Sequence, residues 1–356
     1  MEAFVYEALP QRVVFGFGTR TSLPQEVDRL GLTRVMVLST PEQAAMAGEL
    51  SALLGGKSAG VLASAAMHTP VEVTEKALEK VRAAAVDGLV PVGGGSTTGL
   101  GKAIALRSDL PQIVLPTTYA GSEATSIIGQ TEGGRKTTQR TSKVLPETIL
   151  YDVELTASLP VGLSVTSGLN AIAHAVEARY ARDRNPLISI LALEGIRALA
   201  GALPRIVRNP EDLMARSDAL YGAWACGTCL GAVEMALHHK VCHTLGGSFD
   251  LPHAETHAVM LPHTTAYNEA IVRDLLAPVA QCLGAPSAAR GLYDLAASLG
   301  APTRLGDLGM AKAAIGRAAD LILQNPYWNP RPLVREHIVA MLEDAFEGRP
   351  PPRPRN

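Results

Sequence analysis

Hydrophobic and polar residues alternate differently in the two halves of this chain. In the first half, short runs rich in Val, Ile and Leu are typical of strands buried on both faces. They are RVMVLST (34–40), GLVPVGGGS (88–96), QIVLPTT (112–118) and TILYDV (148–153), and the clearest helical spacing among them is PVEVTEKALEKVRAAA (70–85). Strands that alternate with helices predict a parallel sheet covered on both faces, with ligands at the carboxyl ends of the strands.

From Thr156 onward the strand pattern gives way to helical spacing. Apolar residues recur at helical intervals in PLISILALEGIRALAGAL (186–203) and again over residues 214–245. We therefore predict an α/β domain over residues 1–155 and a helical domain over residues 156–356. The length of 356 residues agrees with two domains, because it exceeds what a single core usually holds.

Composition and charge narrow the class of protein. Hydrophobic residues make up 47 % of the chain and charged residues 19 %, as in a globular protein with a large core. The net charge of -2, without a Lys/Arg block, argues against nucleic acid as a partner. The N-terminus lacks the apolar segment of a signal peptide and no uninterrupted apolar run of about 18 residues occurs, so we expect no membrane partner and a cytoplasmic protein. The four cysteines are irregularly spaced, which predicts reduced thiols.

A glycine-rich loop lies where a predicted strand meets a predicted helix. Its residues are Gly93, Gly94, Gly95 and Ser96. Glycines at such a junction let the backbone approach a phosphate, and the free N–H groups at the start of the helix favour its negative charge. The loop therefore predicts a dinucleotide site, although it lacks the GxGxxG spacing and a tight turn without a ligand remains the alternative.

A second loop of small and hydroxyl-bearing residues follows the next predicted strand. It is LPTTYAGSEATS (115–126), with Thr117, Thr118 and Ser122. Because the carboxyl ends of adjacent parallel strands meet at one crevice, both loops are expected to face the same ligand. This strengthens the prediction of a nucleotide site.

Histidines are concentrated in one stretch of the predicted helical domain. HHKVCHTLGGSFDLPHAETH (238–257) contains five of the nine histidines. His239 and His243 are four residues apart, as are Asn170 and His174, so each pair shares one face of a helix. With His253 these side chains could hold a divalent cation or move protons. A buried polar network is the alternative, and we expect His257 and His263 to be structural.

These motifs together resemble the iron-containing alcohol dehydrogenase family. The resemblance spans RVVFGFG (12–18), GGGSTTGLGKA (93–103), PTTYAGSEAT (116–125), GLNAIAHAVEA (168–178), residues 238–263 and NPYWNPRP (325–332). The wording LPHAETHAV is most similar to the branch that reduces maleylacetate. The resemblance implies a Rossmann-like nucleotide-binding domain followed by an all-α domain, in a dehydroquinate synthase-like architecture, and a homodimer.

Three positions depart from the family pattern. The family's four metal ligands fall on Asn170, His174, His239 and His253, and the first is an Asp in the family. A neutral amide there removes a charge, so Fe or Zn is expected to bind weakly and not to be required. In the phosphate loop GGGSxxDxxK, Gly99 replaces the Asp while Lys102 is retained. Ser39 replaces an Asp that contacts the adenosine ribose in NAD-preferring relatives, so NADH and NADPH both remain candidate cofactors.

The resemblance also implies an activity. It is the NAD(P)H-dependent reduction of the conjugated carbon–carbon double bond of 2-maleylacetate to 3-oxoadipate, in the catabolism of aromatic compounds. His243 lies near the nicotinamide by family position and is the expected donor or general acid, supported by His239, His253 and His174.

A small dicarboxylate substrate requires positive groups in its site. The sequence candidates are Lys136, Arg140, Lys143 and Arg331. Two other functions stay open at this point: a metal-dependent alcohol dehydrogenase acting on a small alcohol or aldehyde, and a nucleotide-binding protein without catalysis, whose histidines are structural.

Overall fold

The computed structural model describes residues 3–133 and 135–351 of the chain. The chain forms two compact units, one spanning Ala8–Leu159 and the other combining Met1–Glu7 with Pro160–Asn356. The sequence pattern placed the change from α/β to helical structure after residue 155, and it gave no sign that the first residues belong with the helical unit.

The α/β unit contains a six-stranded parallel sheet with the order β1-β8-β5-β4-β2-β3. The strands are β1 (Arg12–Gly16), β2 (Val35–Ser39), β3 (Ser58–Ala63), β4 (Gly88–Gly93), β5 (Ile113–Pro116) and β8 (Thr148–Asp152). The four predicted strands are present. The pattern missed β1 and β3, because they lie at the sheet edges and are only partly buried, so they lack a continuous apolar run.

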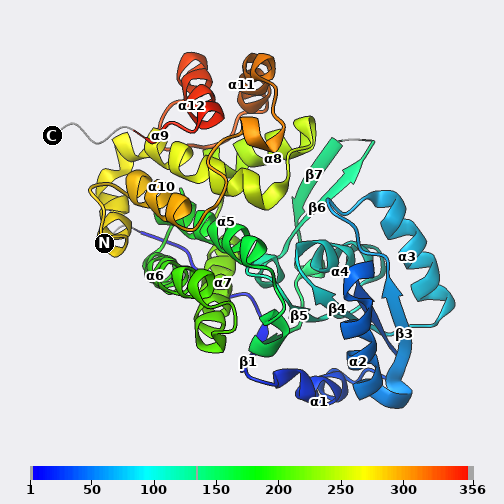
Figure 1. Ribbon diagram of the computed structural model, residues 1–356. Coiled ribbons are helices and arrows are strands. Elements are labelled where there is room, and N and C mark those ends of the chain that lie inside the picture. Colours follow the sequence, from blue (N-terminus) through cyan, green and yellow to red (C-terminus); the bar gives the residue numbers. More distant parts are fainter. Residues whose placement is uncertain (1–2, 134, 352–356) are drawn as a thin grey trace. The chain divides into compact units, whose positions relative to one another are not determined.

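Helices cover both faces of this sheet (Figure 1). α1 (Leu23–Arg29) and α2 (Ala44–Leu54) pack on one face, and α3 (Val71–Ala83) and α4 (Gly95–Ser108) on the other. Successive side chains of β2 alternate between the two cores: Val37 packs with the α1 and α2 residues, and Leu38 packs with those of α3 and α4.

An antiparallel hairpin departs from the purely parallel prediction. It consists of β6 (Ile127–Glu132) and β7 (Arg135–Arg140) and forms a separate two-stranded sheet. Its sequence is largely polar, so it lacks the apolar runs on which the strand prediction depended.

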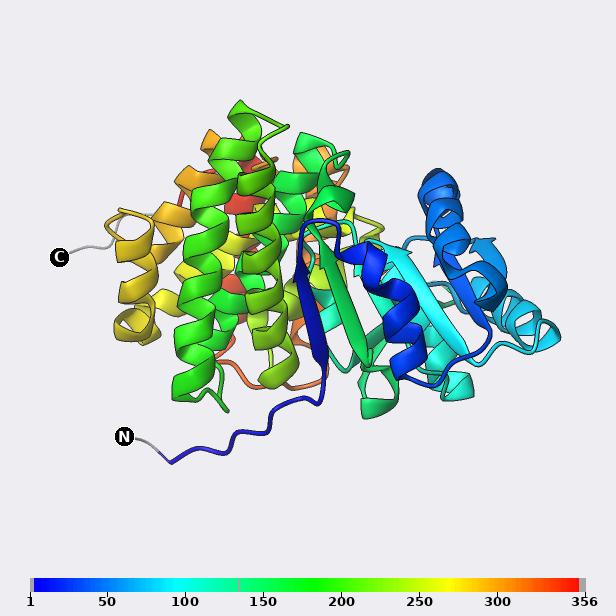
Figure 2. The same ribbon diagram turned by 90° about the horizontal axis from the view of Figure 1, so that it is seen from below.

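The described part of the helical unit is built mainly of α-helices. They are α5 (Val161–Tyr180), α6 (Pro186–Arg208), α7 (Leu213–Ala232), α8 (Leu237–Phe249), α9 (His253–Cys282), α10 (Ala288–Ser298), α11 (Ile315–Leu323) and α12 (Arg335–Glu347). Figure 2 shows α6 and α7 side by side. A core formed by α8, α9, α11 and α12 includes Leu245, Met260 and Leu342.

One of these helices is long and apolar enough to cross a membrane by length and composition. It is α6, and α7 with α8 would pass the same test if the 97° bend between them were ignored. In the structure α6 packs against α5 and α7 and carries an ion pair between Glu194 and Arg197. Of its most apolar window, 44 % is buried in the structure.

Candidate active site

The glycine loop joins β4 to the start of α4. Gly93 ends the strand with φ of +153°, and an added Cβ there would lie 2.4 Å from Thr97 Oγ1. At Gly94 an added Cβ would lie 2.7 Å from Thr118 Cγ2, whereas at Gly95 it would meet nothing within 4 Å. No side chain caps the first turn of α4. The loop therefore brings backbone close to its neighbours and leaves open space and free N–H groups at the helix start.

The loops after β2, β4 and β5 come together because these strands are neighbours in the sheet. Gln43 Nε2, in the loop after β2, donates to Thr117 Oγ1 after β5 at 2.8 Å. Ser39 is fully buried, and its hydroxyl has no hydrogen-bond partner among the described residues. Gln43 was missed from the sequence, since nothing local predicts that it reaches Thr117. The sheet changes winding direction beside β4, which is where nucleotides bind in such folds.

Lys102, which the sequence predicts to contact the cofactor, is bonded to the loop after β5 in this structure. Its ammonium lies 2.6–2.9 Å from Ser122 O, Thr125 O, Thr125 Oγ1 and Ile127 O, and the side chain is fully buried. Burial lowers the pKa of Lys102 to about 7, against the smaller effect of Glu123. Because its hydrogen bonds hold the loop after β5, the side chain is committed to shaping the crevice, and the geometry gives no support to a direct phosphate contact.

Six histidines form one continuous cluster between α5, α8 and α9. The ring centres of neighbouring members are 4.5–6.4 Å apart, and the members are His174, His238, His239, His243, His253 and His257. All four histidines predicted as catalytic lie within this cluster. His257 was predicted to be structural, yet its ring lies 4.5 Å from that of His253 and 5.3 Å from that of His239.

One hydrogen-bonded chain in the cluster begins at Glu177 of α5. Glu177 Oε2 accepts from His239 Nδ1 at 2.5 Å, and His239 Nε2 lies 2.8 Å from His174 Nδ1. The same carboxylate accepts the backbone N–H groups of Ala236, His238 and His239 at the start of α8. With a neutral His239, the proton on its Nδ1 leaves Nε2 to accept from His174. Glu177 therefore orients His239, and its position three residues after His174 was the available sequence signal.

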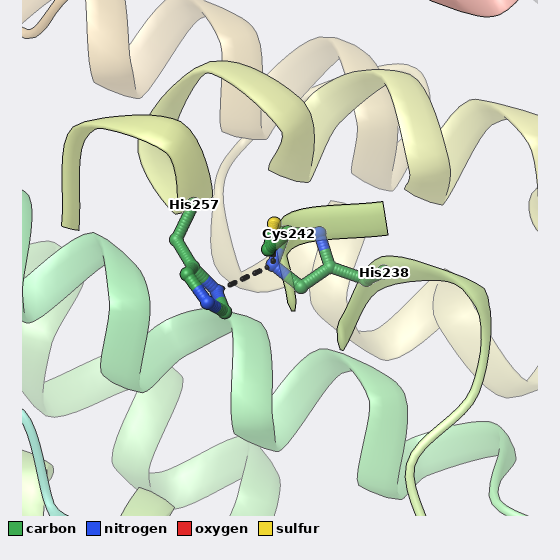
Figure 3. Close-up of side chains that lie close together, drawn as sticks. All are labelled: His238, Cys242 and His257. Carbon is green, nitrogen blue, oxygen red and sulfur yellow. Dashed lines mark hydrogen bonds between the residues drawn. The ribbon is translucent and has the colours of Figure 1, made fainter. Parts of the chain in front are cut away.

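A second chain runs from Thr264 through His238 to His257, and Figure 3 shows its bond between His238 and His257. Both bonds of His238 measure 2.9 Å. Burial lowers the pKa of His238 and of His257 well below the usual value, so both rings are neutral at physiological pH. His257 Nε2 is buried and has no partner among the described residues, as is also true of Asn170 Oδ1.

Two groups in the cluster have residue types that can hold a metal. His238, Cys242 and His257 bring their ligand atoms within 4.8 Å of one another (Figure 3), but the two imidazoles are already hydrogen-bonded to each other. The group predicted from the sequence is Asn170, His174, His239 and His253. It contains no anionic oxygen, and two of its nitrogens lie 2.8 Å apart, whereas a tetrahedral zinc site separates them by about 3.3 Å. Neither group fits a stable iron or zinc ion in this arrangement.

The six histidines of the cluster differ in their exposure to solvent. His174, His238, His239 and His257 are buried, whereas His243 and His253 are half-buried and stack with ring centres 6.4 Å apart. A small molecule therefore reaches His243 and His253 first, and the buried members support them.

The predicted cationic residues lie on different elements. Arg331 stacks on Tyr267 at 4.4 Å and donates to its carbonyl oxygen, so it holds the chain after α11. Lys143 pairs with Asp109 at 3.6 Å, and Arg140 is exposed on β7, both in the α/β unit. The side chain of Lys136 lies outside the described residues. Substrate binding by any of them stays a prediction.

Known proteins match this chain over nearly its whole length. Sequence profiles of the iron-containing alcohol dehydrogenase and of the C-terminal part of that family match residues 10–153 and 164–346. A maleylacetate reductase of a Rhizobium species is 60 % identical over 351 residues, covering 99 % of this chain and 100 % of that protein. The crystal structure of maleylacetate reductase from Agrobacterium tumefaciens has a TM-score of 0.95 at 58 % identity, covering 99 % and 100 % of the two chains. The crystal structure of a putative alcohol dehydrogenase from Ralstonia eutropha has a TM-score of 0.98 at 56 % identity, with the same coverage. The chain belongs to the iron-containing alcohol dehydrogenase family.

Proposed function

We propose that this chain is an oxidoreductase that reduces 2-maleylacetate to 3-oxoadipate with NADH or NADPH, in the catabolism of aromatic compounds. The observation that carries the proposal is the similarity, at 60 % identity over the full length, to a protein named maleylacetate reductase. The histidine cluster supports it, because half-buried imidazoles beside buried ones can supply hydrogen-bond donors to a substrate oxygen.

The reaction requires one hydride and one proton. In maleylacetate the carbon–carbon double bond is conjugated to a ketone, so hydride from the dihydronicotinamide adds to the carbon β to that ketone. The electron pair of the double bond moves to the ketone oxygen and forms an enolate. A proton then adds to the α carbon, the enolate collapses to the ketone, and the oxidised nicotinamide and 3-oxoadipate remain.

The residues of the cluster divide these tasks. We assign His243 as the donor to the enolate or as the general acid, because it is half-buried and its family position is near the nicotinamide. His253 stacks beside it, and the chain Glu177–His239–His174 fixes the orientation of the buried imidazoles. No step passes through a metal, since the donor set at Asn170, His174, His239 and His253 does not fit one.

The choice of cofactor rests on the crevice beside β4. We propose that Gly93, Gly94, Gly95 and Ser96 receive the pyrophosphate and that Ser39, Thr117, Thr118 and Ser122 line the same crevice. A buried serine at the end of β2 carries no charge that would repel a 2'-phosphate, so the proposal includes NADPH as well as NADH. We further propose a homodimer in the cytoplasm, on the basis of the family resemblance.

The experiment follows NADH and NADPH oxidation at about 340 nm with maleylacetate and, in parallel, with simple aldehydes, each with and without EDTA. We expect rapid oxidation with maleylacetate that resists the chelator. Asn170→Asp is the matched control, because it restores an anionic oxygen and should increase retained zinc or iron, measured as metal content after dialysis. Oxidation with aldehydes that collapses in EDTA would instead establish the metal-dependent alcohol dehydrogenase.

A further inference from the structure

The segment NPYWNPRP (325–332) is held firmly against the histidine-bearing helices. Asn329 exchanges two hydrogen bonds with Asn268 of α9, at 2.8 and 3.0 Å. Its Oδ1 also accepts from the backbone N–H of Leu237, the first residue of α8, at 3.4 Å. These bonds fix the segment beside α8. The segment connects α11 to α12, and a connection alone would not require these bonds.

The segment presents Tyr327 to Lys240 of α8. The ammonium of Lys240 lies 5.6 Å from the centre of the Tyr327 ring, within the range of a cation–π contact. Among the described residues, no carboxylate or other oxygen lies within bonding distance of that ammonium. Lys240 is half-buried, so its charge is only partly solvated while no anion compensates it among the described residues.

The hydroxyl of Tyr327 is a second group without a partner in the described structure. It is buried from solvent and forms no hydrogen bond there. Burial raises the pKa of Tyr327, so the hydroxyl keeps its proton and remains a donor. A buried donor beside a poorly compensated cation is costly unless a third group completes the arrangement.

An anion is the group that would satisfy both. The nearby carboxylate is Glu177, whose charge contributes to the raised pKa of Tyr327. Its oxygens are already occupied by His239 and by the backbone N–H groups at the start of α8. Lys240 is three residues before His243 on α8, so the two side chains are neighbours on the helix surface.

We propose that Lys240 and the hydroxyl of Tyr327 bind one carboxylate of the substrate beside His243. The inference rests on the proposed function and extends it, since it names residues that select a dicarboxylate over a simple enone or aldehyde. Lys240 supplies the charge, Tyr327 supplies a directed hydrogen bond, and the NPYWNPRP segment positions Tyr327.

The test compares Lys240→Met with the wild-type protein in the maleylacetate assay. Met keeps the apolar stem and removes the charge, so we expect the KM for maleylacetate to rise about 10- to 100-fold, the range for a lost hydrogen bond to a charged group. The KM for the nicotinamide should stay within about twofold, and Lys240→Arg should restore part of the loss. Tyr327→Phe should raise the KM for maleylacetate about 3- to 10-fold.

Matched control variants distinguish the loss of a specific substrate contact from the general effect of removing a positive charge or a hydroxyl group. Lys312 also lies over an aromatic ring, Phe346, but it is exposed and paired with Glu347, so Lys312→Met should leave both KM values unchanged. Tyr293 donates to Gly348 O, so Tyr293→Phe should likewise leave them unchanged. A KM for maleylacetate that stays within twofold in Lys240→Met would overturn the proposal.

Calorimetric binding of adipate distinguishes failure of this inference from failure of the proposed function. Adipate is a stable dicarboxylate of the same chain length as the product. If the wild-type protein does not turn over maleylacetate, the proposed function fails. The carboxylate site then stands only if adipate binds the wild type and binds Lys240→Met at least tenfold more weakly. If turnover is present and adipate binds both proteins equally, the carboxylate site alone is overturned.

Discussion

The two units of this protein each bury a polar cluster, and the clusters differ in how completely they are satisfied. In the α/β unit, Lys102 has four oxygens within hydrogen-bond distance, and Glu123 accepts from Tyr151 at 2.9 Å. In the helical unit, the histidine cluster leaves Asn170 Oδ1 and His257 Nε2 without partners among the described residues. Around Lys102 the charged groups are paired, although the buried hydroxyl of Ser122 has no partner among the described residues; in the helical unit the unpaired atoms include a ring nitrogen of a histidine.

This difference distinguishes a cluster that stabilises the fold from a cluster that can react with a ligand. A buried cluster whose groups are all paired stabilises one loop conformation and has little to offer a ligand. A cluster with unpaired groups and two half-buried members can still bind and exchange protons with a substrate. In the α/β unit we propose that a ligand is bound instead by the backbone N–H groups of the glycine loop, together with the hydroxyl-bearing side chains of the same crevice.

The strongest test of the histidine cluster is the substitution His243→Ala. Turnover of maleylacetate should fall at least about a hundredfold, because a positioned acid or donor is lost. Steady-state kinetics at saturating NADH measures the effect, and His337→Ala, an exposed histidine of the same unit, is the control that should leave turnover unchanged. An unchanged rate in His243→Ala would show that this residue takes no part in the mechanism. The histidine cluster would then be assigned a structural role, like the cluster around Lys102.

The glycine loop is tested by Gly95→Asp. An added Cβ at Gly95 meets nothing within 4 Å, so the protein should fold, and the new carboxylate should crowd and repel the phosphates of the dinucleotide. We expect the KM for NADH or NADPH to rise at least about tenfold without a comparable change in the KM for maleylacetate. Gly56→Asp, another open position in the same unit, is the control. Unaltered cofactor binding in Gly95→Asp would mean that the nucleotide binds elsewhere.

The buried Lys102 should affect how the free energy of unfolding depends on pH. The pKa of Lys102 is lowered from 10.5 to about 7 in the folded protein, so between these values the unfolded chain holds a proton that the folded chain has released. The free energy of unfolding should therefore rise with pH in this window, by at most about 1.4 kcal/mol per pH unit for one proton. Urea unfolding of the wild type and of Lys102→Met at several pH values measures the difference.

The free energy of unfolding of the wild type, relative to that of Lys102→Met, should rise from about pH 7 toward pH 10 and stay constant below pH 7. Lys57, a half-buried residue paired with Asp28, provides the control variant Lys57→Met, which removes a lysine outside the Lys102 cluster. A constant contrast for Lys102→Met would show that the buried ammonium keeps an ordinary pKa.

Much of the α/β unit could be predicted from local pattern. The four buried strands and α3 were predicted because strands covered on both faces are continuously apolar and amphipathic helices repeat every 3.6 residues. The edge strands β1 and β3 and the β6–β7 hairpin were missed, since partial exposure removes that signal. The predicted strand at 88–96 also ran past its end, because Gly95 and Ser96 begin α4.

The candidate site could be predicted only in part. Spacing along the chain put Asn170 with His174 and His239 with His243 on shared helix faces. It could not reveal that Glu177 orients His239, 62 residues away, or that Gln43 reaches Thr117, 74 residues away. Nor could it show that Lys102 would be occupied by the loop after β5, or that Lys240 would lie over Tyr327.

The sequence by itself determined the periodicities, the glycines at the end of β4 and the family membership, because these depend on residue types within short windows or across an unbroken alignment. The tertiary structure decided which histidines are buried, which nitrogens are paired and which cation lacks an anion. The physical reason is that hydrogen bonding and desolvation depend on distances of a few ångströms between separate helices, and those distances are set by how the helices pack.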